Sequence, residues 1–350
     1  MKRKRRKTNP QSGDLARAFA LIAGIQAILR LVTVRMVHLI DALHLGKPDV
    51  ICIALVECGP NELLLVDSGP ESVFGTVVAG IRELGFQPGD VRHLLASHIH
   101  LDHSGGAWRW AKEFGTKIYV NPRGAPHLVD PAKLVGSAAR IYGDKMNALW
   151  GAAGTIPADQ VIAVEDGAKL QFGSKQFRVL YTPGHAQHHN AYWLESERTV
   201  FAGDVAGVLI RGGPPIPPFP PPDIHLEIWK DSLDKLRALK PASLHITHFG
   251  KVDDPTRILD ALEKRLFSWA DWMKRRFLEG KSEMEIITEF ERFTVQELLA
   301  DGTPKEDLVT YEQADPASMS VAGLARYWRK YHPEQVPRIG GDLTKRGGGA

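Results

Sequence analysis

The strongest constraint on the fold is a series of short apolar runs that recur along residues 36–250. Each run is bounded by glycine, proline or aspartate, which is typical of β-strands separated by turns. Residues 72–84 and 106–114 lie between such runs and carry apolar residues at helical spacing. Strands mixed with helices over this length predict a layered α/β domain. The strand-like runs are ICIALVEC, ELLLVD, HLLASH, KIYVN, QFRVLYT, AYWLES, TVFAGD and SLHITH.

The pattern changes after residue 250, where longer amphipathic segments replace the strand-like runs. The first segment predicts a helix that begins at an aspartate cap, carries Pro255 in its first turn and ends at Gly280. Two more helices are predicted within residues 282–302 and 318–332. We therefore expect four parts. These are a basic tail with a short apolar helix (1–35), an α/β domain (36–250), a helical extension (251–335) and a flexible tail (336–350).

Charge and cysteine content narrow the class of protein. The net charge is +3, but the basic head at residues 2–7 contributes six positive charges, so the rest of the chain carries −3. We therefore expect no nucleic-acid partner. Cys52 and Cys58 are the only cysteines and lie in one apolar run. We expect both to be reduced core residues, which favours a cytoplasmic location.

The apolar run at residues 18–29 leaves two interpretations of the N-terminus open. Its length suits the core of a signal peptide better than a membrane span, but no small-x-small cleavage site follows it. The interpretation we favour is a basic tail with a packing helix, or a start codon placed upstream of Met36. Neither interpretation predicts a stable membrane span.

Histidines are unusually dense in the stretch SHIHLDHSGG at residues 97–106, and other apolar runs supply residues that can join them. His98 begins the loop that follows one strand-like run. Four other runs end in the same way, each on a histidine or an aspartate. Ligands of open α/β sheets bind beyond the carboxyl ends of strands, so these side chains should share one edge of the fold. The residues after the other four runs are Asp67, His185, Asp204 and His248.

The residue types in this group favour metal chemistry. Imidazoles bind Zn²⁺, Fe or Mn²⁺, and carboxylate oxygens add hard ligands to the site. The candidate metal ligands number seven, which is more than one tetrahedral site needs. They are His98, His100, Asp102, His103, His185, Asp204 and His248. Two metals bridged by an aspartate fit this set better than one. No serine-centred elbow, phosphate-binding loop or thiol site in the sequence favours another chemistry.

These residues form a recognisable pattern. The run His-x-His-x-Asp-His at residues 98–103, with VDSGP, TPGHAQHH, FAGD and THFG in that order around it, resembles the metallo-β-lactamase-fold hydrolase superfamily. Within that superfamily, the pattern resembles the glyoxalase II and lactonase branches. It also resembles a group of superfamily members from bacteria and archaea. The resemblance spans about residues 36–250 and implies a four-layer αββα sandwich with metals at one sheet edge. The C-terminal helical extension lies outside the resemblance.

The resemblance also implies a role for each residue of the group. The first metal would be bound by His98, His100 and His185. The second metal would be bound by Asp102, His103 and His248. Asp204 would bridge the two ions, and Asp67 would orient the metal loop without binding metal. Asp102 is also the residue expected to hold or pass the proton in catalysis.

Three assignments stay open between alternatives. His245 and His248 compete for one ligand role, and we favour His248 because it stands at the end of its run. His188 or His189 could orient a ligand, with His188 as our candidate, or both could be exposed loop residues. The proline-rich residues 211–223 could form a stiff connection, a rigid wall over the site, or both.

Three functions are consistent with these residues. The first is a hydrolase that binds two zinc ions, with iron or manganese as alternatives, and cleaves a small ester, lactone or thioester by attack of metal-bound hydroxide. The second is a mononuclear iron oxygenase of the same fold, resembling persulfide dioxygenases. The third is a metal-dependent phosphodiesterase that processes nucleic acid. We favour the hydrolase and expect a small-molecule substrate; the sequence predicts no oligomeric state.

Overall fold

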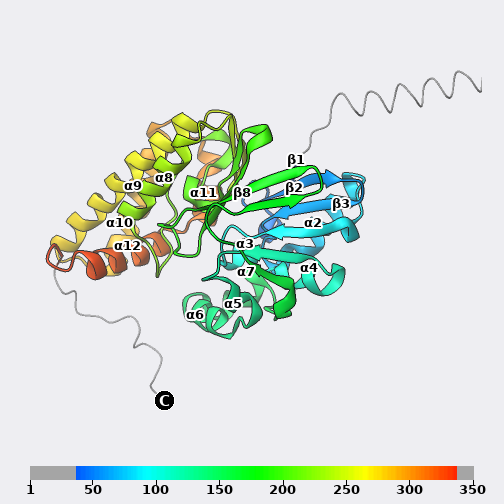
Figure 1. Ribbon diagram of the computed structural model, residues 1–350. Helices are drawn as coiled ribbons and strands as arrows, with labels where there is room; N and C mark the ends of the chain where they lie inside the picture. The colour runs from blue at the N-terminus through cyan, green and yellow to red at the C-terminus, as the bar shows by residue number, and fades with distance from the viewer. Residues whose placement is uncertain (1–36, 337–350) are drawn as a thin grey trace, which may run out of the picture. The chain divides into compact units, whose positions relative to one another are not determined.

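Two six-stranded sheets form the centre of the fold (Figure 1). The computed structural model describes residues 37–336, so the predicted basic tail and apolar helix at residues 1–35 lie outside the described residues. The predicted flexible tail also lies outside them, apart from Val336. By their contacts, residues 39–336 belong to one unit.

The first sheet has the strand order β1-β2-β3-β4-β5-β6. β2 and β3 are antiparallel, whereas β3, β4, β5 and β6 are successively parallel. The carboxyl ends of β3 and β4 therefore lie at the same edge of the sheet. The strands are β1 (Val37–Asp41), β2 (Cys52–Gly59), β3 (Glu62–Val66), β4 (Val91–Leu95), β5 (Lys117–Val120) and β6 (Val161–Ala163).

The second sheet has the strand order β12-β11-β10-β9-β8-β7. Its strands are antiparallel to their neighbours except for the parallel pair β10 and β11. β8, β10 and β11 therefore run in one direction, and their carboxyl ends lie at one edge. The strands are β7 (Lys169–Phe172), β8 (Lys175–Tyr181), β9 (Asn190–Leu194), β10 (Thr199–Phe201), β11 (Ser243–Ile246) and β12 (Gly250–Val252).

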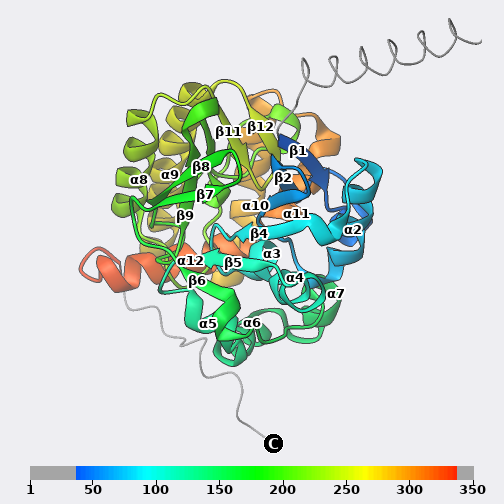
Figure 2. The same cartoon turned by 45° about the vertical axis from the view of Figure 1, so that its right-hand side comes forward.

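Helices cover the outer faces of both sheets. α2 and α4 lie against the first sheet, and α8 and α9 lie against the second (Figure 1, Figure 2). Within residues 37–336, no helix is long and apolar enough to cross a membrane. The helices are α2 (Phe74–Glu83), α3 (Leu101–Ser104), α4 (Ala107–Phe114), α5 (Ala125–Val129), α6 (Ala132–Tyr142), α7 (Met146–Trp150), α8 (Leu226–Ala238), α9 (Pro255–Leu278), α10 (Glu283–Ala300), α11 (Leu308–Ala314) and α12 (Ala317–Tyr331).

Alternate residues of the strands build the layers, because successive side chains point to opposite faces of a sheet. Leu65 of β3 joins an apolar cluster with Val77 and Trp110 of the covering helices. The inner faces of the two sheets meet each other, and the Tyr192 hydroxyl of β9 donates a hydrogen bond to the carbonyl of Ala96 at 2.7 Å. The order helix, sheet, sheet, helix confirms the predicted αββα sandwich.

The C-terminal helices continue the core of the second sheet. α9 begins as predicted, with Asp254 accepting a hydrogen bond from the backbone N–H of Arg257 at 3.1 Å. Trp269 of α9 and Phe290 of α10 lie in the same apolar cluster as Leu244 of β11. β12 straddles the expected boundary at residue 250, and the four-part domain division remains a prediction.

Candidate metal centre

Strand ends deliver the predicted site residues to one edge of the sandwich. Asp67 follows β3, and His98 follows β4 after a short turn. Across the second sheet, His185 follows β8 and His248 follows β11. Asp204 lies in the short 3₁₀ helix after β10. The first and second sheets therefore each contribute to the same site.

His98, His100 and His185 form the first cluster, and their role as metal ligands remains a prediction. The Nδ1 atom of His100 lies 2.8 Å from Nε2 of His98 and 3.2 Å from Nε2 of His185. All three ligand atoms lie within 4.8 Å of one another. They converge closely enough for one cation to contact all of them.

Asp102, His103 and His248 form the second cluster, which is equally tight. The Oδ2 atom of Asp102 lies 3.7 Å from Nε2 of His103 and 3.5 Å from Nε2 of His248. Asp102 and His103 both come from α3, the four-residue helix that follows the loop after β4. This short helix brings both residues to the strand-end residue His248. The ring of His103 also lies 4.0 Å from that of His98, so the two clusters adjoin.

Asp204 lies between the two clusters and presents one carboxylate oxygen to each. Its Oδ2 atom lies 3.3 Å from Nε2 of His185 and 3.9 Å from Nε2 of His98, both in the first cluster. Its Oδ1 atom lies 3.2 Å from Nε2 of His103 and 3.7 Å from Nε2 of His248, both in the second. This arrangement is the one that a bridging carboxylate requires.

Two buried atoms at the centre have no hydrogen-bond partner: Nε2 of His103 and Oδ1 of Asp204. Leaving buried polar atoms unpaired costs about 1–3 kcal/mol each, so native proteins rarely do so. A cation between them would satisfy both atoms. Imidazole nitrogens with two carboxylates suit zinc, iron or manganese, so the residues present fit a metal.

Asp67 accepts hydrogen bonds from the metal loop with both carboxylate oxygens. Oδ1 accepts a hydrogen bond from the backbone N–H of Ser97 at 2.7 Å. Oδ2 accepts from the Ser97 hydroxyl at 2.9 Å, the Thr247 hydroxyl at 2.9 Å and Nδ1 of His103 at 2.8 Å. Four donors therefore hold one buried carboxylate and join β3, the metal loop and the end of β11.

Other histidines of the two clusters are oriented through Nδ1. His185 donates to the carbonyl of Pro218 at 3.1 Å, and His248 donates to the carbonyl of Val50 at 2.6 Å. Nδ1 of His98 lies 3.0 Å from the Ser97 hydroxyl. With Nδ1 engaged in this way, Nε2 is the atom of each ring that faces the centre. Such partners fix the tautomer of metal-binding histidines.

Of the two loop histidines, His189 makes the orienting contacts. Its Nε2 atom accepts a hydrogen bond from the backbone N–H of Asp204 at 3.2 Å, and its Nδ1 atom lies 2.8 Å from the Thr182 hydroxyl. The ring of His188 lies 5.7 Å from that of His100 and lines the cavity beside the clusters. An orienting role for His188 remains a prediction, whereas His189 bonds directly to the backbone of the bridging residue.

The electrostatics of the site favour metal-binding protonation states for the carboxylates and the first cluster. Burial, followed by the neighbouring His103 and His100, lowers the pKa of His98 well below its ordinary value. Burial alone would raise the pKa of Asp204, but the facing histidines, led by His103, lower it. Burial would likewise lower the pKa of His103, but Asp204 and Asp102 raise it. Metal binding would displace that proton, because only neutral imidazole is a ligand.

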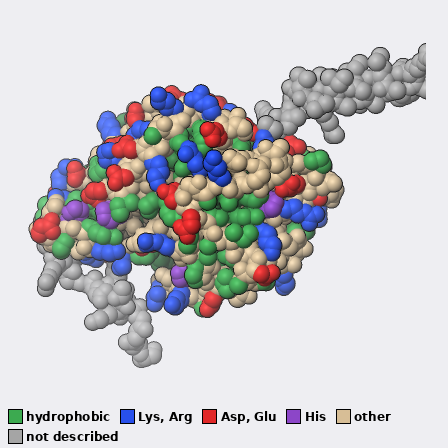
Figure 3. Space-filling model, viewed as in Figure 1, with side chains coloured by type: hydrophobic (Ala, Val, Ile, Leu, Met, Phe, Trp, Pro, Cys, Tyr) green, Lys and Arg blue, Asp and Glu red, His purple; other side chains and the backbone are tan. Residues whose placement is uncertain are grey.

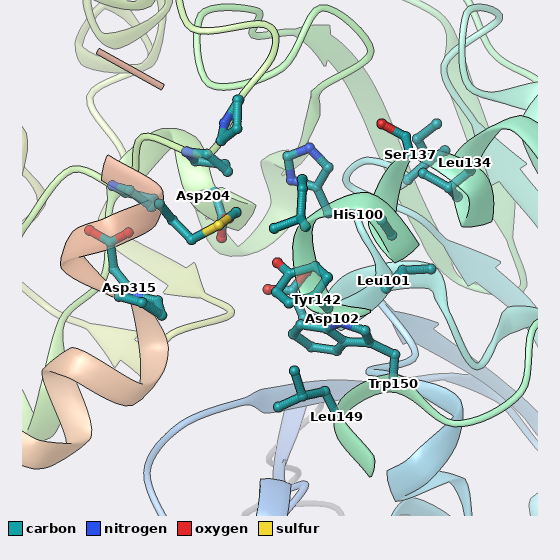
Figure 4. Close-up of a pocket in the computed structure, with 18 of the residues that line it drawn as sticks. His100, Leu101, Asp102, Leu134, Ser137, Tyr142, Leu149, Trp150, Asp204 and Asp315 are labelled. Atoms are coloured by element: carbon teal, nitrogen blue, oxygen red, sulfur yellow. The ribbon is translucent and has the colours of Figure 1, made fainter. Parts of the chain in front are cut away.

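A cavity of about 420 Å³ opens over the two clusters (Figure 4). His100, Asp102 and Asp204 line its polar end. The proline-rich segment forms part of its wall through Pro218 and residues 220–223, as one of our two interpretations expects. Residues 313–316 and Met319 from the C-terminal helical region complete the lining.

Comparisons with known proteins identify the family of the chain. A family model described as the metallo-beta-lactamase superfamily matches residues 48–248. A metallo-beta-lactamase fold-containing protein of Sulfurisphaera tokodaii is 27% identical over 237 residues, which cover 67% of this chain and 85% of that protein. A hydroxyacylglutathione hydrolase of Methylococcus capsulatus is 28% identical over 173 residues, which cover 48% of this chain and 50% of that enzyme.

A solved structure supports the fold. A metallo-beta-lactamase family protein from Thermus thermophilus aligns with a TM-score of 0.61 at 21% sequence identity, covering 84% of this chain and 93% of that chain. The family model spans more than half of the chain and contains every residue of the two clusters. The chain therefore belongs to the metallo-β-lactamase superfamily of metal-dependent hydrolases.

Proposed function

We propose that this protein binds two divalent metal ions, zinc in the first instance, and hydrolyses a small ester, lactone or thioester. The observation that carries the proposal is the position of Asp204, whose two oxygens face two separate three-residue clusters. The similarity to a hydroxyacylglutathione hydrolase supports acyl compounds as substrates, since an acylglutathione is a thioester. Iron and manganese remain alternatives for the metal.

In this reaction the acyl–oxygen or acyl–sulfur bond breaks, and water supplies a hydroxyl group to the acid and a proton to the alcohol or thiol. Bound divalent ions would supply a Lewis acid for the carbonyl oxygen and lower the pKa of water. Asp102 lines the cavity, and its Oδ2 atom faces His103 and His248. Its Oδ1 atom is then the one available to accept the proton of water and return it to the leaving group.

The residues around the centre support these roles for the metal ions and for Asp102. Pro218 and Val50 hold His185 and His248 through backbone carbonyls, so the two rings are oriented before substrate arrives. The cavity volume is in the range of small-molecule sites, which supports a small-molecule substrate. We also propose a cytoplasmic location, because the described cysteines, Cys52 and Cys58, are buried and free.

The direct test is metal-dependent turnover by the full chain. Purified protein would be analysed for metals and assayed on ester, lactone and thioester panels, before and after chelation and with zinc, manganese or iron restored. We expect turnover with at least one substrate class, lost on chelation and recovered with metal. No turnover by metal-loaded protein on any panel would overturn the proposal, and so would one iron per chain with consumption of O₂ or cleavage of phosphodiesters alone.

A matched pair of histidine variants separates metal binding from general damage. His98→Ala removes a ligand of the first cluster. His245→Gln changes a buried histidine on β11 whose ring stacks on Phe201, outside both clusters. We expect the first variant to lose metal and turnover and the second to keep both. Equal losses in the two variants would contradict the assignment.

A further inference from the structure

The cavity over the metal clusters has a polar end and a much larger apolar part. Leu134, Leu149 and Trp150, from the α6–α7 region, point into it (Figure 4). The proline-rich wall, residues 313–316 and Met319 line it from another side. The elements that build the apolar part thus include a segment beyond residue 248, where the superfamily match ends.

Charge is scarce in this apolar part. Lys133 is the only lysine or arginine among the described residues that line the cavity, and its side chain is exposed at the surface. Anionic substrates usually require several cations or backbone donors in their sites. Asp315, which also lines the cavity, is buried and accepts a hydrogen bond from the Ser320 hydroxyl at 3.0 Å. Burial raises the pKa of Asp315 well above its ordinary value, so this carboxyl group adds no charge to the cavity.

The entrance is apolar as well. Leu45 is 50% exposed and Ile141 is 44% exposed, and both line the cavity. Hydrophobic side chains gather across the middle of the face seen in Figure 3. Exposed apolar side chains that surround an apolar cavity mark a ligand-binding surface more often than a solvated one.

We propose that the substrate carries an uncharged apolar chain or ring, seated against α6, α7, residues 313–316 and Met319, while its acyl carbon lies over Asp204. The protein then prefers apolar esters, lactones or thioesters to anionic thioesters such as those of glutathione. This inference rests on the proposed hydrolase function and specifies its substrate class. The cavity volume of about 420 Å³ leaves room for an acyl chain much longer than acetyl.

A series of esters with acyl groups of increasing length tests the inference, using the metal-loaded, full-length protein. p-Nitrophenyl esters from acetate to decanoate share one leaving group, so differences in kcat/KM report the acyl chain. Each buried methylene should raise kcat/KM by about fourfold until the cavity is filled. S-lactoylglutathione should be a poor substrate. No turnover of any ester, lactone or thioester would overturn the hydrolase proposal itself, whereas a flat ester series or a preference for the glutathione thioester would overturn only this inference.

Variants of Leu134 test where the acyl chain of the substrate lies in the cavity. Leu134→Asp places a charge where its side chain points into the cavity, and Leu134→Ala removes contact area without charge. Both should lower kcat/KM for decanoate, the first by at least tenfold, with little change for acetate and unchanged metal content. Val309→Asp is the control, because Val309 is 70% exposed on α11 outside the cavity lining. Equal losses for acetate and decanoate in both Leu134 variants would overturn the seating against α6.

Discussion

The carboxylate of Asp67 and the imidazole of His103 form a hydrogen bond of 2.8 Å that connects the end of β3 to the metal loop after β4. The bond places the proton of His103 on Nδ1. Its Nε2 atom faces Asp204, 3.2 Å from Oδ1, and is the atom that would donate a lone pair to a bound cation. A residue that binds no metal in our proposal therefore sets the protonation of one that does.

Asp67→Asn tests this relationship. The amide can donate to Nδ1 of His103 and thereby move the proton to Nε2, where it opposes a cation. We expect one of two metal equivalents to bind roughly 10–100-fold more weakly, with the other little changed. Titration against a chromophoric chelator measures both affinities.

Glu62→Gln is the matched control for Asp67→Asn. It alters a similar carboxylate–imidazole contact on the same sheet, 3.2 Å between Glu62 and His93, away from the clusters. The control should bind both metals normally. If Asp67→Asn also bound both metals with wild-type affinity, Asp67 would not set the state of His103.

Chelation should lower the thermal stability of the folded protein. Metal binds the native clusters but not the dispersed ligands of the unfolded chain, and a free metal concentration of 100 times Kd adds about 2.7 kcal/mol to the free energy of unfolding. Scanning calorimetry with excess chelator and after addition of zinc measures the change. Identical melting temperatures under the two conditions would contradict a metal centre at these residues.

His245 should make the protein less stable in mild acid. Burial, assisted by Lys251, lowers the pKa of His245 to about 4, whereas an unfolded histidine titrates near 6.5. Between these values the unfolded chain binds more protons, so the free energy of unfolding falls as the pH falls below about 6.5. The loss attributable to His245 should be about 2 kcal/mol at pH 5.

His245→Gln removes this titration. Denaturant unfolding of wild type and variant from pH 8 to pH 5, in chelator, should show the variant gaining stability relative to wild type as the pH is lowered. The difference between the two proteins isolates His245 from other titrating groups. Parallel curves over this range would show that His245 is not held neutral by burial.

The strands that sequence patterns predicted are those with long apolar runs. β2, β3 and β8 correspond closely to the expected segments. β6 (Val161–Ala163) has only three residues and β7 (Lys169–Phe172) is half polar, so neither stands out from a loop. These strands depend on pairing with neighbours rather than on their own pattern.

One helix was overlooked although its pattern is present. In α8 (Leu226–Ala238) the buried residues Leu226, Trp229, Leu233 and Leu236 recur at helical spacing. α6 (Ala132–Tyr142) is harder to predict, because Ala138 is its only fully buried residue and Gly136 interrupts it. Its role is to line the cavity, and a sequence pattern does not reveal that.

The cluster residues could be picked out in the sequence. His98, His185, Asp204 and His248 follow strands that end at the same edge, and His100, Asp102 and His103 continue the motif that begins at His98. The residues that orient them were harder to identify. Thr247 contacts Asp67 across 180 positions of sequence, and Ser97 looks like an ordinary residue beside the histidine motif. Val50 and Pro218 act through backbone carbonyls, which have no signature in the sequence. Contacts of this kind follow only from the folded chain.

The measurement that tests the account most directly is the metal content of Asp204→Asn. The amide keeps the shape of the side chain but removes the charge that faces both clusters, 3.2 Å from His103 and 3.3 Å from His185. Asp223→Asn is the control, since Asp223 lines the same cavity but belongs to neither cluster. Elemental analysis of folded protein gives metal ions per chain, and turnover is measured on the same samples.

We predict about two metal ions per chain in wild type and in the control, and about one in Asp204→Asn, with turnover lowered on the order of 100-fold. If folded Asp204→Asn retained two metal ions and wild-type turnover, Asp204 would not bridge the clusters, and the two-metal hydrolase would be contradicted.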